Sequence, residues 1–330
     1  MAGGATMKQR LLGPLGPLMA RHLQLRRSLG FILGSDEIAL DQFDRFVAAH
    51  FPAATSVTKP MVVGYLKTLD HLHPATQQHQ IGTLRQFCRF LFQLNPDTYI
   101  PEKGIIPVRK IPKRFYIYTP VEIAGLIQSA KTLPPIGSLR PHTYATIIGL
   151  LWVSGLRIGE VLRLNLQDVE LERNILIVRQ TKFFKSRMVP VTQSTSNALS
   201  DYRTLRAHYG HCQNPDAPFF VNQRAKRCVN RTVSWTFRTI ARSLNFKSAK
   251  GNEPRIYDLR HTFATRSLAA LYKDGKDPNA GLPVLATYLG HVNIACTTVY
   301  LHPSIELLHE AASKFHRNVE WFQGGSHERI

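Results

Sequence analysis

The residues that could do chemistry are gathered in four short segments in the second half of the chain. In the first, Arg157 stands between an apolar helix predicted to end near Gly155 and a new helix predicted to begin near Ile158. A guanidinium fixed at such a junction can bond two oxygens of an incoming phosphate at once. Glu160 falls in the first turn of the new helix, where a carboxylate is favoured. Taken alone, an arginine at a helix start is usually an ordinary surface residue.

The second and third segments have equally ordinary explanations when each is considered alone. Lys182 follows Thr181 at the tip between two predicted strands, where a lysine is usually a solvated turn residue. The third segment runs from Tyr257 to Thr265. Its apolar side chains are expected to face a core, which leaves Arg260 on a different face.

The fourth segment contains His291 and Tyr300, nine positions apart. Pro283 suits the first turn of a helix and Gly290 suits its end, so His291 is expected just past that end. Tyr300 lies in an amphipathic stretch, where a tyrosine in the core is the simpler explanation.

The charge balance of the whole chain points to a polyanionic partner. Its 330 residues include 42 Lys and Arg against 22 Asp and Glu, a formal net charge of +20. Such a protein repels itself unless a polyanion neutralises it, so nucleic acid is the leading partner and an anionic membrane surface the competing one. The most apolar later segment, residues 144–156, is too short to span a bilayer.

The cysteines and the first residues of the chain favour a cytoplasmic protein. Four cysteines in a chain of this length, with no CxxC pair, form no disulfide framework. Residues 11–20 superficially resemble a signal peptide. Their Gly-Pro pairs and the basic residues that follow argue against one. We therefore expect a cytoplasmic protein with no membrane partner.

The pattern of elements predicts a mainly α-helical protein with a small antiparallel β-sheet. Residues 1–104 form a helical domain, residues 105–116 a basic, proline-rich linker, and residues 117–330 an α+β domain. The sheet is expected from residues 168–171, 175–179 and 188–191. Six basic residues could meet phosphates, two on a helix of the first domain and four in the linker: Arg85, Arg89, Arg109, Lys110, Lys113 and Arg114. A solvated helix face and a linker charged for solubility are the alternatives.

Together and in this order, the four segments resemble the signature of the tyrosine recombinase, or phage integrase, family of site-specific DNA recombinases. That signature has an Arg in a Gly-Leu-Arg-x-Gly-Glu context, a hairpin Lys and a His-x-x-Arg box. A Leu-Gly-His segment and a tyrosine about nine residues later complete it. Each motif alone is weak, but four in the family's order are specific. The similarity covers roughly residues 115–302, while residues 1–104 are similar to the family's core-binding domain only as a helical, basic module.

The resemblance implies an enzyme that cleaves and rejoins double-stranded DNA without metal, ATP or another cofactor. Tyr300 would attack the scissile phosphorus, leaving a 3′-phosphotyrosyl link and a free 5′-hydroxyl. Arg157, Arg260 and His291 would form a clamp that stabilises the charge growing on the phosphate oxygens. Glu160 matches a supporting position of the same site.

The general acid has two candidates in the predicted hairpin turn. Lys182 matches the family's acid, which protonates the departing 5′ oxygen. Lys185 is the neighbouring candidate, because Phe183-Phe184-Lys185 replaces the small residues usual in this turn. We favour Lys182, since it follows the threonine of the family's pattern.

Tyr257 departs from the family, because it stands where the His-x-x-Arg box begins with histidine. A phenol can donate a hydrogen bond, but with a pKa near 10 it is a poor base at neutral pH. We expect Tyr257 to donate to the phosphate. His261 matches the family's second, structural histidine.

The last predicted helix, with an apolar stripe from Ile305 to Val319, packs on its own domain or docks on a neighbouring protomer. The resemblance favours docking in a tetramer on DNA, with accessory DNA-bending or partner recombinase proteins as further partners. An integrase or transposase of a mobile element is the leading function. A type IB topoisomerase-like enzyme and a DNA-binding protein that has lost catalysis are the alternatives.

Overall fold

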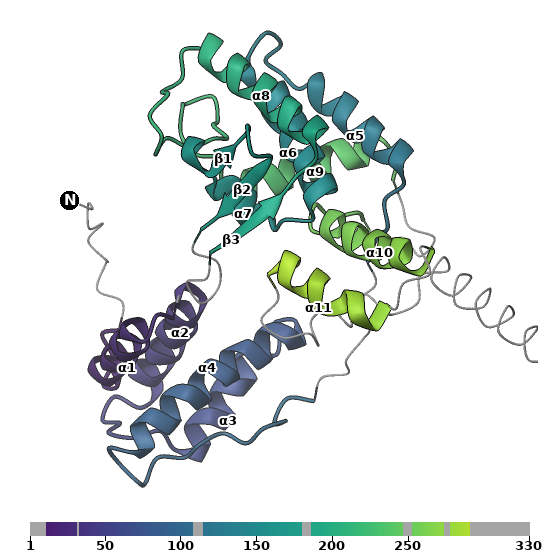
Figure 1. Cartoon of the computed structure of the whole chain (residues 1–330). Helices are drawn as coiled ribbons and strands as arrows, with labels where there is room; N and C mark the ends of the chain where they lie inside the picture. The colour runs from purple at the N-terminus through teal and green to yellow at the C-terminus, as the bar shows by residue number, and fades with distance from the viewer. Residues whose placement is uncertain are drawn as a thin grey trace, which may run out of the picture. The chain divides into compact units, whose positions relative to one another are not determined.

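The computed structural model describes residues 11–31, 33–107, 115–179, 186–246, 253–273 and 278–290. The chain divides into two units, Met1–Pro112 and Lys113–Ile330 (Figure 1). Within the described ranges, no helix is both long enough and apolar enough to cross a membrane. The mainly helical class with one small antiparallel sheet, predicted from the sequence, is confirmed.

Four helices make up the described part of the first unit. They are α1 (Gly16–Ser28), α2 (Gly34–His50), α3 (Lys59–Thr68) and α4 (Pro74–Phe92). Apolar side chains at helical spacing on α2 and α4, among them Phe43, Leu84 and Phe87, are fully buried in one core. The opposite face of α4 is polar, which is where the sequence pattern places Arg89.

The second unit is organised around the apolar helix α6 (Leu139–Ser154). This helix packs against α5 (Pro120–Lys131), α8 (Gln193–His208) and α10 (Asp258–Lys273). The short α7 (Ile158–Arg163) follows α6 directly, and α9 (Asn230–Ser243) packs against α5 and α7. Because α6 is buried on most sides, its C-terminal end is a fixed point from which the next residues are positioned.

The sheet has the order β1-β2-β3 and is antiparallel throughout. Its strands are β1 (Val169–Glu170), β2 (Ile175–Val178) and β3 (Arg187–Pro190). Leu176 pairs with Val189, and Val178 pairs with Arg187 at the end of the β2–β3 hairpin next to its turn. The turn that the sequence predicted between these strands is residues 179–186, and 180–185 of it lie outside the described residues.

The helix α11 (Pro278–Leu289) packs beside α10, as Figure 1 shows. It ends where the sequence predicts, because Gly290 adopts a φ of 67° that stops the helix. Its start was predicted wrongly, since Pro283 lies inside the helix instead of in its first turn. Proline removes one backbone donor but still has a helical φ, and packing against α10 through Leu282 and Leu285 favours the longer helix.

Candidate active site

The junction between α6 and α7 holds Arg157 where the sequence predicts it. Gly155 closes α6 in the left-handed conformation, with a φ of 59°. Arg157 is the N-cap residue of α7, and its backbone N–H donates to Glu160 Oε2 at 3.0 Å. The Arg157 side chain keeps 34% of its surface exposed, so its guanidinium can meet a ligand from solvent.

Glu160 is buried and joins Arg157 to a second arginine, Arg187. Arg157 Nη1 donates to Oε1 at 2.9 Å, while Arg187 Nη1 and Nη2 donate to Oε1 and Oε2 at 3.1 and 2.9 Å. Burial alone would raise the pKa of Glu160. The hydrogen bond and charge of Arg187, followed by those of Arg157, outweigh burial and lower this pKa from 4.5 to about 2. The carboxylate is therefore ionised at neutral pH and holds both guanidinium groups.

Arg260 lies in the interior of the unit, which corrects the sequence expectation of a separate face. Only 1% of the residue is exposed, and its neighbour on α10, Leu259, is equally buried. Arg260 Nη1 donates to Gly155 O at 2.8 Å, and Nη2 donates to Leu289 O at 2.7 Å. These carbonyls satisfy donors that burial would otherwise leave without water. Arg260 thus links the end of α6 to the end of α11.

Arg187 was not singled out in the sequence, yet it belongs to the same cluster. It is the first residue of β3, and its Nε donates to Tyr288 O at 2.9 Å. Its ion pair joins residues 27 positions apart in the sequence, so no local motif reveals it.

The C-terminal end of α11 is the point where three arginines meet. Its last carbonyls carry the negative end of the helix dipole and lack partners within the helix. Tyr288 O accepts from Arg187, Leu289 O from Arg260, and Gly290 O from Arg157 Nη2 at 3.3 Å. His291 follows Gly290 in the sequence. Sequence segments 157–160, 187, 260 and 288–290 are therefore brought together in one cluster.

Tyr257 lies immediately before α10 and is 44% exposed. Its ring meets the buried His261 edge-on, with ring centroids 4.9 Å apart. The adjacent Asp258 accepts from the backbone N–H of Arg255 at 2.9 Å and starts the helix. The Tyr257 side chain is thereby set at the helix start and remains accessible.

Several predicted site residues lie outside the described residues: Lys182, His291, Tyr300, Arg109, Lys110, Lys113 and Arg114. The two predicted contacts on α4 differ from each other. Arg85 is half-buried, and it donates to Pro101 O at 2.6 Å and also to Glu102 O. Arg89 is exposed.

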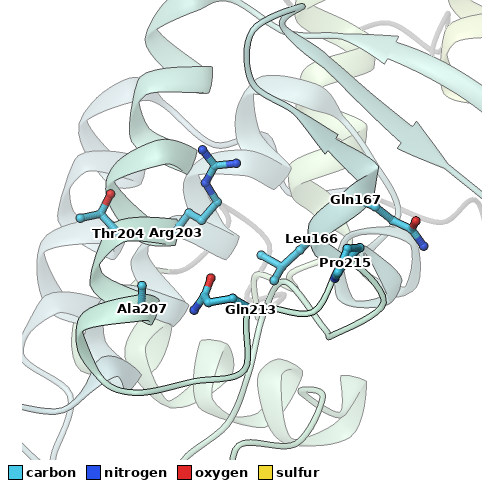
Figure 2. Close-up of a pocket in the computed structure, with 7 residues that line it drawn as sticks. All are labelled: Leu166, Gln167, Arg203, Thr204, Ala207, Gln213 and Pro215. Carbon is cyan, nitrogen blue, oxygen red and sulfur yellow. The ribbon is translucent and has the colours of Figure 1, made fainter.

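A separate open hollow of about 510 Å³ lies beside α8 (Figure 2). Arg203, Thr204 and Ala207 come from α8, and Leu166 and Gln167 come from the 3₁₀-helix η1 (Leu166–Asp168). No candidate site residue lines this hollow, so it is not part of the arginine cluster.

Comparison with known proteins gives the same family over most of the chain. The model of the phage integrase family matches residues 118–306. A Sinorhizobium fredii protein whose name describes it as an integrase/recombinase, y4rB, is 35% identical over 303 residues, which are 91% of this chain and 96% of the relative. The tyrosine recombinase XerC of Pelobacter propionicus is 28% identical, over 89% of this chain and 92% of that protein.

Two solved structures share the fold at low identity. One is the XerH site-specific recombinase in a post-cleavage complex with its difH substrate, at a TM-score of 0.64 and 20% identity over 91% of this chain and 84% of that one. The other is a lambda integrase dimer bound to a core site, at a TM-score of 0.59 and 17% identity over 85% and 96% of the two chains. The family match covers more than half of the sequence and the 35% identical relative nearly all of it, so this chain belongs to the phage integrase family, the tyrosine recombinases.

Proposed function

We propose that this protein is a site-specific recombinase that cleaves and rejoins double-stranded DNA through a 3′-phosphotyrosyl intermediate. The observation that carries the proposal is the meeting of Arg157 and Arg260 at the helix end that directly precedes His291. Both are bonded to that end, by Nη2 to Gly290 O and Leu289 O respectively. Two guanidinium groups and one imidazole beside a scissile phosphate supply the fixed positive charge that phosphoryl transfer requires.

In this mechanism Tyr300 attacks the scissile phosphorus and the bond to the 5′ oxygen breaks. Lys182, with Lys185 as the neighbouring alternative, gives a proton to the departing oxygen. The phosphotyrosyl bond preserves the energy of the broken phosphodiester, so rejoining by another 5′-hydroxyl needs no external energy source. Arg157 is suited to contact the phosphate because a third of its side chain faces solvent while Glu160 fixes its orientation.

Tyr257 is proposed to donate its phenolic hydrogen to the phosphate. Its exposure at the start of α10, three residues before Arg260, supports this assignment. His261 has a structural role beside it, since it is buried against the Tyr257 ring.

DNA binding outside the active site is assigned to the first unit and the linker. Arg89 is exposed on α4 and can reach a phosphate. Arg85 supports the same face indirectly, because its donors hold the backbone at Pro101 and Glu102. The basic linker residues Arg109, Lys110, Lys113 and Arg114 add positive charge to the part of the sequence where the two units join.

The active assembly is proposed to be a tetramer on DNA, joined through the segment after His302. A protein that relaxes supercoils as a type IB topoisomerase would not need this assembly. The recombinase and integrase names of its relatives favour recombination over relaxation. A member that has lost catalysis is less compatible with a sequence that retains all of Arg157, Lys182, Arg260, His291 and Tyr300.

The test is capture of SDS-stable protein–DNA adducts on fragmented genomic DNA. The parent protein is compared with Tyr300→Phe and Tyr257→Phe. Adducts should form with the parent and vanish in Tyr300→Phe, because the phenylalanine has no oxygen to attack phosphorus. Tyr257→Phe should form them more slowly. Sequencing of the trapped fragments gives the cleavage site.

Adducts that persist in Tyr300→Phe would mean that another residue is the nucleophile. Tight DNA binding without adducts from the parent would contradict the cleavage function itself. Fragments scattered without a common sequence would favour the topoisomerase-like alternative.

A further inference from the structure

We propose that Arg187 is a positioning residue for DNA cleavage, a role that rests on the proposed function. Its side chain ties the turn-proximal end of the β2–β3 hairpin to the C-terminal end of α11. The hairpin carries the proposed general acid, and the end of α11 directly precedes His291. Arg187 therefore sets the acid and the phosphate clamp in one fixed arrangement.

The contacts of Arg187 use every nitrogen of the guanidinium. Nε donates to Tyr288 O at 2.9 Å, and the two Nη atoms donate to the two Glu160 oxygens at 3.1 and 2.9 Å. The Glu160 side chain is 2% exposed and that of Arg187 is 14% exposed. A bidentate arginine–carboxylate pair with so little solvent access is held in a single geometry, so it forms a rigid connection.

Gly290 permits this connection by having no side chain. A Cβ at position 290 would lie 2.7 Å from Arg187 Nη1 and 2.9 Å from its Cζ. The φ of 67° at Gly290 is also one that side-chain-bearing residues rarely adopt. The guanidinium therefore packs directly against the residue that precedes His291.

The same contacts separate the role of Arg187 from that of Arg157. Arg157 shares Glu160 but keeps 34% of its side chain exposed, whereas Arg187 is largely enclosed by Glu160, Tyr288 and Gly290. Arg157 is thus available to a phosphate, and Arg187 acts through the groups that it holds.

Because Arg187 lies at the turn-proximal end of β3, its contacts can affect residues on both sides of it. Arg187 pairs with Val178 as the last pair of the hairpin before the turn. Lys182 is five residues earlier, and His291 is three residues after Tyr288. Since strand and helix end share one side chain, a shift of either would move the other by a similar distance. Misplacement of about 1 Å can cost roughly 100-fold in rate.

Lysine cannot replace this arginine. An ammonium is a single point charge, so it cannot hold both oxygens of Glu160 while it also reaches the Tyr288 carbonyl. We therefore expect Arg187→Lys to behave almost like Arg187→Gln. Arg173→Gln is the matched control, because Arg173 also pairs with a glutamate beside a strand, donating to Glu170 Oε2 at 2.9 Å from an exposed position.

The first measurement is hydrogen exchange of the whole 330-residue chain without DNA. In Arg187→Lys and Arg187→Gln, amide protection at residues 286–290 should fall by at least about tenfold, since a hydrogen bond from a charged donor to that end is lost. Peptides from α5, α6 and α8 should exchange as in the parent, and the Arg173→Gln protein should match the parent everywhere.

The second measurement is single-turnover cleavage of a nicked duplex that carries the site recovered by adduct capture. Both Arg187 variants should cleave about 100-fold more slowly, with dissociation constants for the duplex within about threefold of the parent value. A variant that cleaves at the parental rate, or retains full protection at residues 286–290, would overturn the proposal.

Two other outcomes identify different roles. Weaker DNA binding with a lower salt dependence would mean that Arg187 contacts a phosphate, and loss of protection throughout the unit would mean that it only maintains the fold. Either outcome contradicts a positioning role. If the parent forms no adduct, the proposed function fails, while the exchange data still decide whether Arg187 holds the end of α11.

Discussion

At the scale of single residues, Glu160 is the charge on which the arginine cluster depends. It is buried, yet Arg187 and Arg157 keep its pKa at about 2. Since this is below the value of 4.5 for an unpaired glutamate, the resulting stabilisation is complete above pH 4.5 and is lost as the pH falls through about 2. A pKa lowered from 4.5 to about 2 corresponds to about 3 kcal/mol in the free energy of unfolding.

Glu160→Gln should therefore lower the free energy of unfolding by about 3 kcal/mol at pH 7, because two guanidinium groups lose their counter-charge. The difference from the parent should nearly disappear between pH 5 and pH 2. Urea unfolding followed by tryptophan fluorescence measures this, since Trp152, Trp235 and Trp321 all belong to the second unit.

Glu253→Gln serves as the control for Glu160→Gln. Glu253 pairs with Arg242 at 2.8 Å, but both side chains are more than half exposed. Its replacement should cost less than about 1 kcal/mol at any pH. A Glu160→Gln difference that does not change between pH 5 and pH 2 would contradict the buried ion cluster.

At the scale of elements, the contact between the end of α6 and α10 fixes Arg260. Gly155 needs its left-handed conformation, and a Cβ there would lie 2.3 Å from Phe263 Cδ1 on α10. Gly210, just beyond α8, has a similar φ of 73° but open space around it. Replacing each glycine by alanine therefore distinguishes two costs. Gly210 tests the positive φ alone, and Gly155 tests the positive φ together with the steric clash against Phe263.

Gly210→Ala should cost about 1 kcal/mol for its positive φ alone. Gly155→Ala should cost a further 1–3 kcal/mol, roughly, because its methyl group pushes Phe263 and α10 away. Fluorescence-monitored urea unfolding of both variants gives the comparison. Equal losses would mean that α10 can move without cost.

Packing between elements also decides how much of the site could be predicted from the sequence. Capping glycines and an apolar helix place Arg157 and Glu160 correctly, because both depend on residues within a few positions. The start of α11 at Pro278 and the burial of Arg260 were missed, because tertiary packing decides them. Arg187 was missed for the same reason. Its partner is 27 residues away, and no sequence period links a strand end to a helix end.

At the scale of the whole molecule, a net charge of +20 makes DNA affinity a function of ionic strength. Binding that neutralises six or more phosphates should weaken by roughly 10³ or more between 50 and 200 mM salt. Arg89→Gln should reduce the slope of log affinity against log salt by about one, as expected for one lost phosphate contact. Fluorescence anisotropy with a labelled duplex measures both slopes.

Arg45→Gln is the control for this slope. Arg45 is also an exposed arginine of the first unit, but it pairs with Asp41 on its own helix. Its replacement should leave the slope unchanged. A slope that responds equally to both variants would indicate diffuse attraction instead of a contact at Arg89.

The carboxylate shared by Arg157 and Arg187 also has a thermodynamic consequence. This buried group joins a helix junction to a strand, and Arg187 extends the connection to the end of α11, so ordering any one of the three favours the order of the other two. Such linkage is reciprocal. A DNA contact at the hairpin stabilises the end of α11 by the same coupling free energy with which a contact at that end stabilises the hairpin. Engagement of the duplex on one side of the cluster would thus prepare the other side for cleavage.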